Sequence, residues 1–367
     1  MQRLSKKIIC IVGTRPEAIK MAPVILALRE HPWADVKVLV TAQHRGMLDQ
    51  ILQEFSIVPD YDLNVMQPDQ SLSALTGRLL IDLEKVLKAE KPDAVLAQGD
   101  TTTVLASAMA CFYTGIAFGH IEAGLRTSDL QNPFPEEFNR VIVGKMAKWH
   151  FAPTTQSAKN LHAEGIPVDQ IYVTGNTVID SLKYIASQDF SNATTHPRKS
   201  ILVTAHRREN FGEAFQNICS AIHTLATRNP DVDIIFPVHP NPNVRLIAHH
   251  LLSDVPNIEL KEPLGYRHFI QAMVQCHFIL SDSGGIQEEA PSLGKPVLVL
   301  RDSTERPEAL EAGCIRLVGS DSSKIVRESE LLLNDREEYK KMAKGASPYG
   351  DGDAASRIIG VLQEHFS

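Results

Sequence analysis

Short apolar runs rich in Val and Ile alternate with helical patterns along almost the whole chain, and this alternation constrains the fold more than any other feature of the sequence. We expect strands at IICIVG, VKVLVTA, DAVLAQGD, IAFGHIEAG, WHFAPT and QIYVTGN in the first half, and at SILVTAHR, DIIFPVHP, NIELKEPL, HFILSD, PVLVLRD and CIRLVG in the second. Helices of moderate length are expected between them, for example at 16–30, 71–89 and 213–229. Continuous apolar strands joined by crossover helices are typical of parallel sheets. The sequence therefore predicts an α/β protein.

A polar stretch at 183–200 interrupts this alternation, and the length of 367 residues favours two domains. We expect residues 1–182 to form an N-terminal Rossmann-like domain and residues 198–350 to form a C-terminal one, with the two domains facing one another across a cleft. The amphipathic segment 353–367 follows the turn signal PYGDGD. It is expected to form a helix that crosses back to the first domain.

The composition argues against several classes of protein. A formal net charge of −7 and a pI near 6.1 disfavour a surface for nucleic acid or for an anionic membrane. The five cysteines are widely spaced within apolar runs, which indicates reduced core thiols of a cytoplasmic protein. The most lipid-like stretch, 104–121, is interrupted by polar residues, so no membrane span is predicted. Neither GxGxxG after the first strand nor GxxxxGK(S/T) occurs, which disfavours dinucleotide oxidoreductases and P-loop NTPases.

The segment 281–310 contains the pattern expected of an anion-binding turn. An apolar strand ends at Asp282, and Ser283, Gly284 and Gly285 then bring backbone N–H groups to the start of a helix. Such a helix end attracts anions, and a carboxylate in its first turns can reach a ribose hydroxyl. An ordinary strand-to-helix turn is the alternative, so the pattern predicts a nucleotide-like ligand only together with the rest of the chain.

Several carboxylates follow predicted strands of the first half, where ligands bind in open parallel sheets. They are Asp100, Glu122 and, at the start of a helix after NPFPEE, Glu136 with Glu137. Each one alone has a structural alternative as a helix cap or a dipole partner. Carboxylates brought to one cleft raise one another's pKa and can divide the roles of acid and base. We therefore interpret the group as the acid/base machinery of an enzyme.

Basic and imidazole side chains lie near other strand ends. His206 precedes two arginines, a combination suited to phosphate oxygens or a leaving group, and His239 leaves the next strand. Arg15 and Lys20 lie at the start of the first helix and can clamp an anionic nucleotide, although a solvated helix face is the alternative for Lys20. A metal site made of His120, His206 and His239 is disfavoured because these histidines are not closely spaced.

The chain resembles the non-hydrolysing UDP-N-acetylglucosamine 2-epimerase family, whose members have the two-domain GT-B fold. The resemblance covers nearly the whole length, and its most specific segments are GTRPEAIKMAPVI, TAQHRGMLDQ, GDTTT, HIEAGLRT, PFPEE, GNTVIDSL, TAHRREN, PVHPNPNVR and SDSGGIQEEAPSLGKPVLVLRDSTERPEA. So many matches in the same order make chance an implausible explanation. The resemblance implies a cytoplasmic homodimer that acts on a UDP-sugar and uses no cofactor and no metal.

The implied reaction inverts C2 of the N-acetylhexosamine and interconverts UDP-GlcNAc and UDP-ManNAc. Removal of the C2 proton and expulsion of UDP from C1 would give a 2-acetamidoglucal intermediate. UDP would then add back, with protonation on the opposite face. Matched by motif, Asp100, Glu122 and Glu136 become the acid/base candidates, and His206 becomes the histidine associated with the phosphate leaving group.

The resemblance also implies binding roles. The candidates for binding the UDP-sugar are Arg15, Lys20, Phe269, Ser283, Gly284, Gly285, Glu289 and Arg306. Among these, Glu289 would bind the ribose and Phe269 would pack near the uracil. In some bacterial members a second UDP-GlcNAc site activates the enzyme, and the matching residues here are Gln43, Arg207 and His239.

Two positions depart from the family pattern, and two other activities remain open. Leu264 stands where close bacterial members can present Gln to the nucleotide, and Gly46 replaces a longer polar side chain beside the activating site. A hydrolysing relative that releases UDP and free ManNAc would share the elimination step. A GT-B glycosyltransferase would share the nucleotide-binding half, but the carboxylates of the first half fit proton chemistry better.

Overall fold

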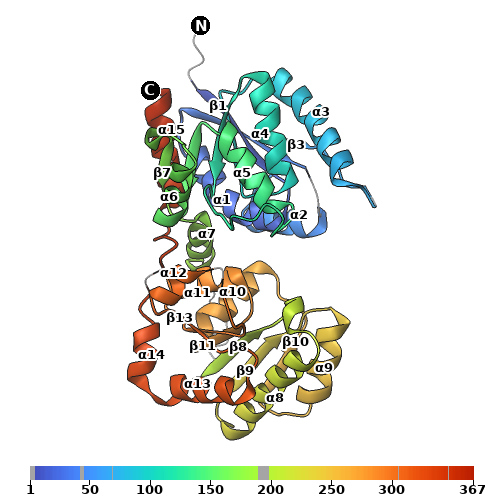
Figure 1. The fold of residues 1–367 in the computed structure, drawn as a ribbon, viewed down its shortest axis with the longest axis vertical. Helices are drawn as coiled ribbons and strands as arrows, with labels where there is room; N and C mark the ends of the chain where they lie inside the picture. Colours follow the sequence, from blue (N-terminus) through green and yellow to red (C-terminus); the bar gives the residue numbers. More distant parts are fainter. Residues whose placement is uncertain (1–4, 42–44, 68, 189–197, 305, 346) are drawn as a thin grey trace. The chain divides into compact units, whose positions relative to one another are not determined.

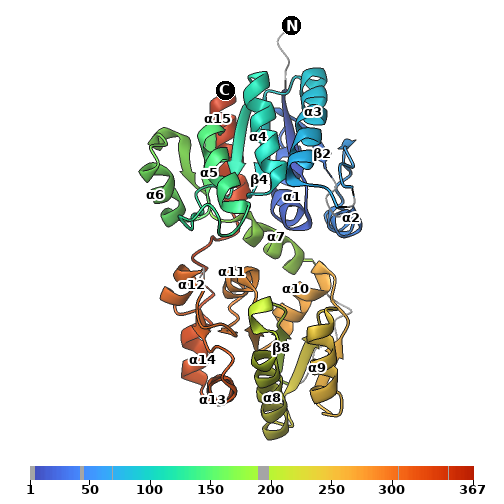
Figure 2. The ribbon, with the colours of Figure 1, turned by 45° about the vertical axis from the view of Figure 1, so that its right-hand side comes forward.

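The computed structural model describes residues 5–41, 45–67, 69–188, 198–304, 306–345 and 347–367 (Figure 1). The chain forms two compact units. Unit 1 comprises Met1–Tyr184 and Tyr349–Ser367, and unit 2 comprises Ile185–Pro348. Each unit contains its own parallel β-sheet with helices on both faces (Figures 1 and 2).

Unit 1 contains a seven-stranded sheet in the order β3-β2-β1-β4-β5-β6-β7, in which all neighbouring strands are parallel. The strands are β1 (Lys6–Val12), β2 (Ala34–Val40), β3 (Tyr61–Asp62), β4 (Ala94–Gln98), β5 (Ala117–Ile121), β6 (Trp149–Ala152) and β7 (Ile171–Val173). Residues 8–12 of β1 are fully buried, as expected for a central strand that is covered on both faces. The sequence prediction missed β3, because two residues are too few to give a periodic signal.

The helices of unit 1 cover both faces of this sheet. They are α1 (Arg15–Arg29), α2 (Arg45–Glu54), α3 (Leu72–Glu90), α4 (Thr102–Thr114), α5 (Glu136–Met146), α6 (Thr155–Ala163), α7 (Thr177–Ala186) and α15 (Ala354–Phe366), with a 3₁₀ turn at Val168–Gln170. Helix α3 shows how the sequence produces the packing, because Leu75, Leu79, Leu83 and Leu87 recur every four residues and form its buried face. Truncating Leu79 to Ala would cost about 2–5 kcal/mol of stability.

The prediction that the C-terminal helix crosses back to the first domain is confirmed. Helix α15 packs against α1, and its Ile358 and Leu362 are buried. The ring of Phe366 lies 6.0 Å from that of Trp149 and 6.2 Å from that of Trp33, measured between centroids. Unit 1 is therefore completed by a segment that follows unit 2 in the sequence.

Unit 2 contains a six-stranded parallel sheet in the order β10-β9-β8-β11-β12-β13. Its strands are β8 (Ser200–Thr204), β9 (Asp233–Pro237), β10 (Ile258–Lys261), β11 (Phe278–Ser281), β12 (Val297–Val299) and β13 (Ile315–Leu317). Its helices are α8 (Glu213–Arg228), α9 (Pro242–Leu252), α10 (Tyr266–Gln275), α11 (Gly284–Ser292), α12 (Pro307–Glu311), α13 (Ser322–Asn334) and α14 (Arg336–Met342), with a 3₁₀ turn at Arg208–Asn210. The predicted α/β class with two Rossmann-like sheets is confirmed.

Each sheet has one point at which the strand order reverses. In unit 1 this switch point lies between β1 and β4, and in unit 2 it lies between β8 and β11. The loops that leave the carboxyl ends of these four strands begin at Gly13, Gly99, Ala205 and Asp282. Ligands of doubly wound sheets bind at such points, because the diverging loops leave a crevice between them. The topology therefore predicts ligand binding by the loops after β1 and β4 in unit 1 and by the loops after β8 and β11 in unit 2. The candidate residues from the sequence lie in these loops or close to them.

Two further expectations concern the cysteines and the membrane. All five cysteines are free and buried, which confirms the prediction of core thiols. Within the described ranges, no helix has both the length and the apolar character that a membrane span requires.

Candidate active-site residues at the two switch points

In unit 1 the loop after β1 packs tightly against the first turn of α4 and against the residue that follows β2, and it leads into α1. A Cβ atom on Gly13 would lie 2.6 Å from Thr103 Oγ1 and 3.0 Å from Thr41 Oγ1, so a larger residue would displace the loop. Thr14 then caps α1 in a capping box, in which the Glu17 carboxylate accepts a hydrogen bond from the Thr14 N–H at 3.2 Å. This geometry fixes where the first turn of α1, with Arg15 and Lys20, begins.

The Glu122 carboxylate of unit 1 has three side-chain partners. Its Oε1 lies 2.6 Å from Lys20 Nζ and accepts a hydrogen bond of 2.8 Å from Asn176 Nδ2, while Gln98 Nε2 donates to Oε2. The backbone of Glu122 adopts a left-handed φ of 64°, which costs of order 1–3 kcal/mol for a residue with a side chain. Side chains from three other segments of unit 1 therefore converge on one carboxylate whose own backbone is strained.

Asp100 follows β4 and is not the helix cap that its sequence allowed. Thr101 is the N-cap of α4 instead, and its Oγ1 accepts from the Val104 N–H at 3.4 Å. The Asp100 carboxylate lies 2.8 Å from Arg140 Nη2 of α5. Burial raises the pKa of Asp100, Arg140 opposes the rise, and the negative charges of Glu122 and Glu136 add to it. Asp100 can therefore exchange a proton nearer to neutral pH than an ordinary aspartate.

The two adjacent glutamates at the start of α5 have different environments. Glu137 is 1% exposed and accepts hydrogen bonds from the N–H groups of Thr127 and Ser128 at 2.9 and 3.0 Å. It therefore organises the loop that precedes α5. Glu136 is partly exposed, and its charge acts on Asp100. Glu136 is therefore accessible for the predicted acid/base role.

His120 connects the ends of β4 and β5. Its Nε2 lies 2.7 Å from the carbonyl oxygen of Gly99, which directly precedes Asp100. In the sequence, one residue separates His120 from Glu122. Burial lowers the pKa of His120 to about 3, so the ring is neutral and donates this hydrogen bond. His120 thus ties together the two turns that carry the acid/base candidates. Among the residues that the structure describes, no group of three or more His, Cys, Asp or Glu side chains is arranged to hold a metal ion.

In unit 2 the buried side chain of Asp282 organises the switch point. Its carboxylate accepts hydrogen bonds of 2.9 Å from the N–H groups of His206 and Arg207, and a third of 3.0 Å from Asn210 Nδ2. Asp282 is fully buried at the end of β11. The loop after β8 is therefore fastened to the loop after β11, and the position of His206 depends on Asp282.

The His206 imidazole lies at the surface of this arrangement. Its side chain is 43% exposed, and its Nδ1 lies 3.6 Å from Asp282 Oδ1. The ring stacks on that of His239, with centroids 5.5 Å apart and an angle of 17° between the planes. His239 Nδ1 accepts from the Asn241 N–H at 3.2 Å, and burial together with His206 lowers the pKa of His239. A neutral ring thus supports one face of an accessible histidine.

The Ser283–Gly285 turn has the features of an anion-binding helix start. Ser283 is the N-cap of α11, but its side chain makes no capping hydrogen bond. A Cβ atom on Gly284 would lie 3.4 Å from Arg207 Nη2 and 3.7 Å from Arg306 Nη2, so two guanidinium groups lie beside the bare backbone. Arg306 Nε also pairs with Glu288. Backbone N–H groups, a helix dipole and two cations together favour a diphosphate.

The remaining predicted residues are placed as follows. Glu289 is partly buried, and its Oε1 lies 3.3 Å from the position that a Cβ of Gly285 would take. Phe269 is half-buried on α10, and among the described residues no hydrogen bond, ion pair or ring contact joins it to the Ser283–Gly285 turn. Arg15 is partly exposed in the first turn of α1. Gln43 lies outside the described residues.

The prediction separated the UDP-sugar site from a candidate activating site, but the structure does not keep all of their residues apart. Arg207 lies beside Gly284 with Arg306, and His239 stacks on His206. The two candidates for activation that the structure describes, Arg207 and His239, therefore lie at the same edge of the unit 2 sheet as the diphosphate candidates. Lys20 does not lie on a solvated helix face, which was the structural alternative for this residue. Its ammonium group forms an ion pair with Glu122 instead.

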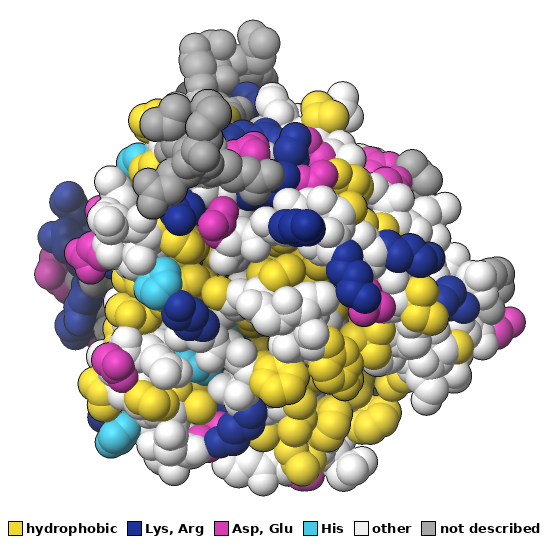
Figure 3. All heavy atoms as spheres, turned by 90° about the horizontal axis from the view of Figure 1, so that it is seen from above, with side chains coloured by type: hydrophobic (Ala, Val, Ile, Leu, Met, Phe, Trp, Pro, Cys, Tyr) yellow, Lys and Arg dark blue, Asp and Glu magenta, His cyan; other side chains and the backbone are white. Residues whose placement is uncertain are grey.

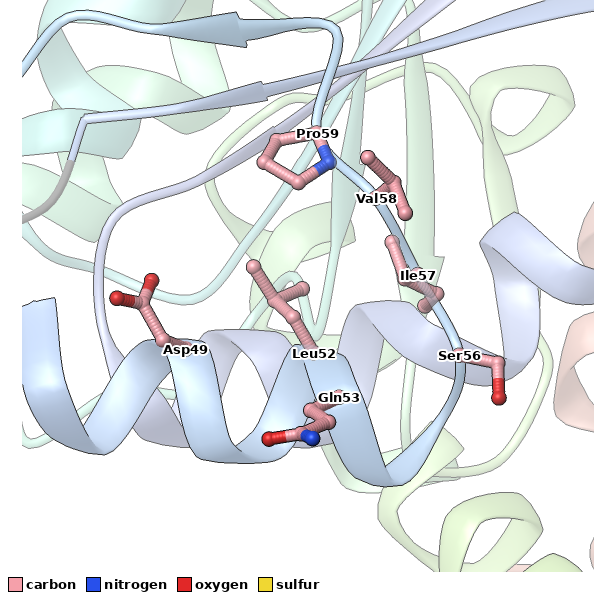
Figure 4. Close-up of a pocket in the computed structure, with 7 residues that line it drawn as sticks. All are labelled: Asp49, Leu52, Gln53, Ser56, Ile57, Val58 and Pro59. Carbon is pink, nitrogen blue, oxygen red and sulfur yellow. The ribbon is translucent and has the colours of Figure 1, made fainter.

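A cavity elsewhere in unit 1 is large, but its lining is not that of an active site. It measures about 450 Å³ and is lined by Asp49, Leu52, Gln53, Ser56, Ile57, Val58 and Pro59 at the end of α2 (Figure 4). None of the predicted site residues lines it. Its walls are mostly apolar, and Figure 4 shows Asp49 and Gln53 on the helix at its edge. It lacks the convergent ionisable groups expected of an active site.

Sequence reasoning missed several residues that hold the candidates in place. Arg140, Gln98 and Asn176 bind carboxylates of unit 1. Asp282 ends a predicted strand, but its role in fastening the loop after β8 is not predicted. Gln98 could have been found because it immediately precedes Gly99-Asp100 at the end of a strand. Arg140 gives no comparable signal, since its distance along α5 from Glu136 has meaning only once the fold is known.

The chain is similar to known proteins over almost its whole length. A family model described as UDP-N-acetylglucosamine 2-epimerase matches residues 26–363. The UDP-N-acetylglucosamine 2-epimerase of Escherichia coli K12 is 52% identical over 371 residues, which cover 98% of this chain and 99% of the relative. The structure of UDP-GlcNAc 2-epimerase from Neisseria meningitidis bound to UDP-GlcNAc is similar with a TM-score of 0.86 and 50% identity, over 98% of this chain and 100% of that chain.

A more distant structure bears on the fold alone. The glycosyltransferase of kitacinnamycin is 13% identical and has a TM-score of 0.66, over 98% of this chain and 100% of that chain. The predicted GT-B-like fold is thereby confirmed.

Proposed function

Since the chain belongs to the UDP-N-acetylglucosamine 2-epimerase family, we propose that it is an isomerase that interconverts UDP-GlcNAc and UDP-ManNAc without releasing free sugar. The observation that carries this proposal is the gathering of Asp100, Glu122 and Lys20 at the switch point of unit 1. Inversion at C2 needs one group to remove a proton and another to return it to the opposite face. A glycosyl transfer alone would need only one base.

The chemical step is an elimination followed by a re-addition. A carboxylate of unit 1 removes the C2 proton, the electrons of the C–H bond form the C1–C2 double bond, and the C1–O bond breaks so that UDP leaves with its electron pair. The product is a 2-acetamidoglucal. Re-addition of UDP at C1, with a proton delivered to the other face of C2, gives the epimer. Asp100, Glu122 and Glu136 are the candidates for these transfers, and Asp100 has the raised pKa that suits proton exchange.

Departure of UDP requires stabilisation of a diphosphate that gains negative charge. The bare backbone at the start of α11 and the guanidinium group of Arg306 can provide it. His206 is exposed, fastened by Asp282 and supported by His239, and it can donate a hydrogen bond or a proton to the departing oxygen. These groups would also hold the diphosphate ready for re-addition.

The other predicted residues complete the nucleotide site in this proposal. Glu289 binds the ribose, Phe269 packs near the uracil, and Arg15 contacts the diphosphate. Lys20 has a second role, because it neutralises Glu122 at 2.6 Å. Arg207, which lies beside Gly284, can serve the same anion. Together with Gln43 and His239 it is also the candidate for a second, activating UDP-GlcNAc site.

One NMR experiment in D2O tests the function. UDP-GlcNAc is incubated with the enzyme, and the sugar signals are followed with time. We expect UDP-ManNAc to appear with deuterium at C2 of both epimers. Free ManNAc accumulating in proportion to UDP would instead identify a hydrolysing enzyme. A complete lack of C2 exchange, with sugar transferred only when an acceptor is added, would identify a glycosyltransferase.

The protein is also proposed to be a homodimer. Large apolar side chains are exposed on α3 and α4 of unit 1, where Phe112 is 66%, Tyr113 69% and Ile81 57% exposed. Hydrophobic side chains gather on part of the face shown in Figure 3. An apolar area of this kind is typical of a protein interface. Sedimentation should give the mass of a dimer, and a Phe112→Lys/Tyr113→Lys variant should sediment as a monomer; a monomeric wild-type protein would refute the proposal.

A further inference from the structure

The GNTVIDSL segment of unit 1 has no role in the mechanism above, although it is one of the specific motifs of the chain. It joins β7 to α7, and its Asn176 is 4% exposed. Asn176 Oδ1 accepts a hydrogen bond of 3.1 Å from the Val178 N–H in the first turn of α7, and Asn176 Nδ2 donates one of 2.8 Å to Glu122 Oε1. Because a backbone N–H can only donate, Val178 fixes which end of the amide faces Glu122.

The backbone of Asn176 contacts the chain segment that returns to unit 1 after unit 2. Its N–H donates a hydrogen bond of 2.6 Å to the carbonyl oxygen of Tyr349, the first residue of the returning segment. Gly175 and Gly350 have φ values of 90° and 135°, which favour glycine. A Cβ atom on Gly350 would lie 3.3 Å from Gly175 Cα and 3.4 Å from Asn176 N, so the two backbones are in direct contact. The returning segment therefore helps to determine where Asn176 lies.

Helix α7, which begins directly after Asn176, also binds the returning segment. Asp180 is 8% exposed, and its Oδ1 accepts a hydrogen bond of 2.8 Å from the Ala355 N–H in the first turn of α15. Lys183 Nζ donates to the carbonyl oxygen of Asp351. The hydrogen bond between Asn176 and Tyr349 is thus one of several between the same two segments, which hold each other in place.

Asn176 and Lys20 bind the same oxygen of Glu122 but contribute differently. Lys20 neutralises the carboxylate at 2.6 Å through a long side chain with many rotamers. Asn176 supplies a neutral donor on a short side chain whose other end is bound to α7. It can therefore restrict the orientation of the carboxylate without cancelling its charge. A group that removes a proton from carbon must be aligned with the C–H bond, and a misplacement of about 1 Å can cost about 100-fold in rate.

We propose that Asn176 is a positioning residue of the epimerase reaction, which orients the Glu122 carboxylate and is itself positioned by the Tyr349–Gly350 backbone. The inference rests on the proposed function, because that function assigns Glu122 to proton transfer. Asn176 acts on the chemical step through Glu122, so its effect falls mainly on kcat. Proton transfer by Glu122 therefore depends on a segment that rejoins unit 1 only after unit 2.

The first test compares kcat and KM of two variants across the range in which the enzyme is active. Asn176→Ala removes the donor, and we expect kcat to fall about 10–100-fold while KM changes less than about threefold. Asn176→Asp keeps the acceptor for the Val178 N–H but places a second carboxyl group beside Glu122. When this pair holds a proton at lower pH, the proton restores a hydrogen bond between them. The kcat of Asn176→Asp relative to wild type should therefore rise as the pH falls.

Asn257→Asp is the matched control for this change. Asn257 is partly buried in unit 2, and its Nδ2 donates to the carbonyl oxygens of Ala226, Asn229 and Val232. The same isosteric substitution there disturbs structural hydrogen bonds but adds no carboxyl group beside Glu122. We expect its kcat relative to wild type to be independent of pH. Wild-type kcat in Asn176→Ala, or the same pH behaviour in Asn176→Asp and Asn257→Asp, would overturn the positioning role.

The second test addresses the returning segment. Gly350→Ala places a methyl group against Gly175 and Asn176, and we expect kcat to fall by a similar factor to that in Asn176→Ala. Because both changes act through one contact, the double variant Asn176→Ala/Gly350→Ala should be little worse than Asn176→Ala alone. Gly165→Ala, at a φ of 83° with open space around the position, is the control for a side chain at positive φ and should keep the wild-type kcat.

The outcomes separate this inference from the proposed function. Losses that add in the double variant would show that the returning segment acts independently of Asn176 and would overturn its part in the proposal. If Gly350→Ala failed to fold, the pH dependence of Asn176→Asp would still decide whether Asn176 orients Glu122. A folded wild-type protein that does not epimerise UDP-GlcNAc would instead refute the proposed function.

Discussion

Lys20 Nζ lies 2.6 Å from Glu122 Oε1, and the two side chains are only 19% and 8% exposed. This pair joins the first helix of unit 1 to the end of β5 across a large separation in sequence. Removing the cation leaves a mostly buried carboxylate, to which the amide groups of Gln98 and Asn176 still donate hydrogen bonds. We expect Lys20→Met to lower the free energy of unfolding by about 1–3 kcal/mol.

Urea denaturation measures this change. The matched control is the double variant Lys20→Met/Glu122→Gln, which should recover part of the loss because no uncompensated charge remains. Equal stability of the single variant and the wild type would show that the ion pair is not important for the fold. Glu122→Gln alone should lower kcat by roughly two to four orders of magnitude, as expected for a lost acid/base group.

Asp100→Asn should lower kcat by roughly two to four orders of magnitude while the protein continues to bind UDP. Arg140 opposes the rise in the pKa of Asp100, so Arg140→Met should move the Asp100 ionisation to higher pH. The pH profile of kcat/KM in Arg140→Met measures this shift directly. A shift to lower pH would contradict the geometry, in which Arg140 Nη2 lies 2.8 Å from the carboxylate.

Asp282→Asn should impair the release of UDP although the residue is buried and away from solvent. Its carboxylate fastens the N–H groups of His206 and Arg207, and an amide at this position accepts fewer of these hydrogen bonds. We expect a loss in kcat of about 10–100-fold, of the same kind as the loss in His206→Ala. The double variant should be little worse than His206→Ala alone, and additive losses would show that Asp282 acts independently of His206.

His150 should make the protein sensitive to acid. Burial lowers the pKa of this residue to about 4, and neither ring nitrogen has a side-chain hydrogen-bond partner within the described ranges. Between pH 6.5 and 4 the unfolded state binds a proton at His150 that the folded state does not bind. The free energy of unfolding therefore falls with decreasing pH, by up to about 1.4 kcal/mol per pH unit for this group.

His150→Leu removes the proton uptake and should make the pH dependence of unfolding shallower in this window. Glu17 acts with the opposite sign, since its folded pKa is raised and its unfolded form loses a proton between pH 4.5 and 7. The comparison of His150→Leu with wild type cancels that contribution because Glu17 is present in both. An unchanged slope would mean that His150 binds its proton equally well in the folded and unfolded states.

Much of the architecture could be predicted from the sequence because it is encoded locally. The buried strands are continuous apolar runs, and α1, α3 and α8 begin within two residues of the predicted positions. The two-residue strand β3 could not be predicted, since it exists only through pairing with β2. The same distinction applies to the candidate site: features encoded locally could be predicted, and features that depend on contacts between elements could not.

Site residues at strand ends could be predicted, because a parallel sheet collects the carboxyl ends of its strands at one edge. Asp100 and Glu122 in unit 1 and His206 and Asp282 in unit 2 are examples. Partners supplied by helices could not, and Arg140 is the clearest case. The left-handed backbone of Glu122 also has no signal in the sequence, because glutamate rarely adopts it. The sequence alone does not show which cation or hydrogen-bond donor compensates a given carboxylate, because this depends on distances between helices and strands.

Helix α15 has a consequence for synthesis on the ribosome. Unit 1 receives its last helix from Ala354–Phe366, after all of unit 2 has been translated. At about 5–20 residues per second the ribosome needs on the order of 10–30 s to make unit 2, and during this time the α1 surface that α15 covers has no partner within the nascent chain. The inserted unit can therefore fold before the unit that surrounds it in sequence. Maturation of the N-terminal half must wait for the end of translation.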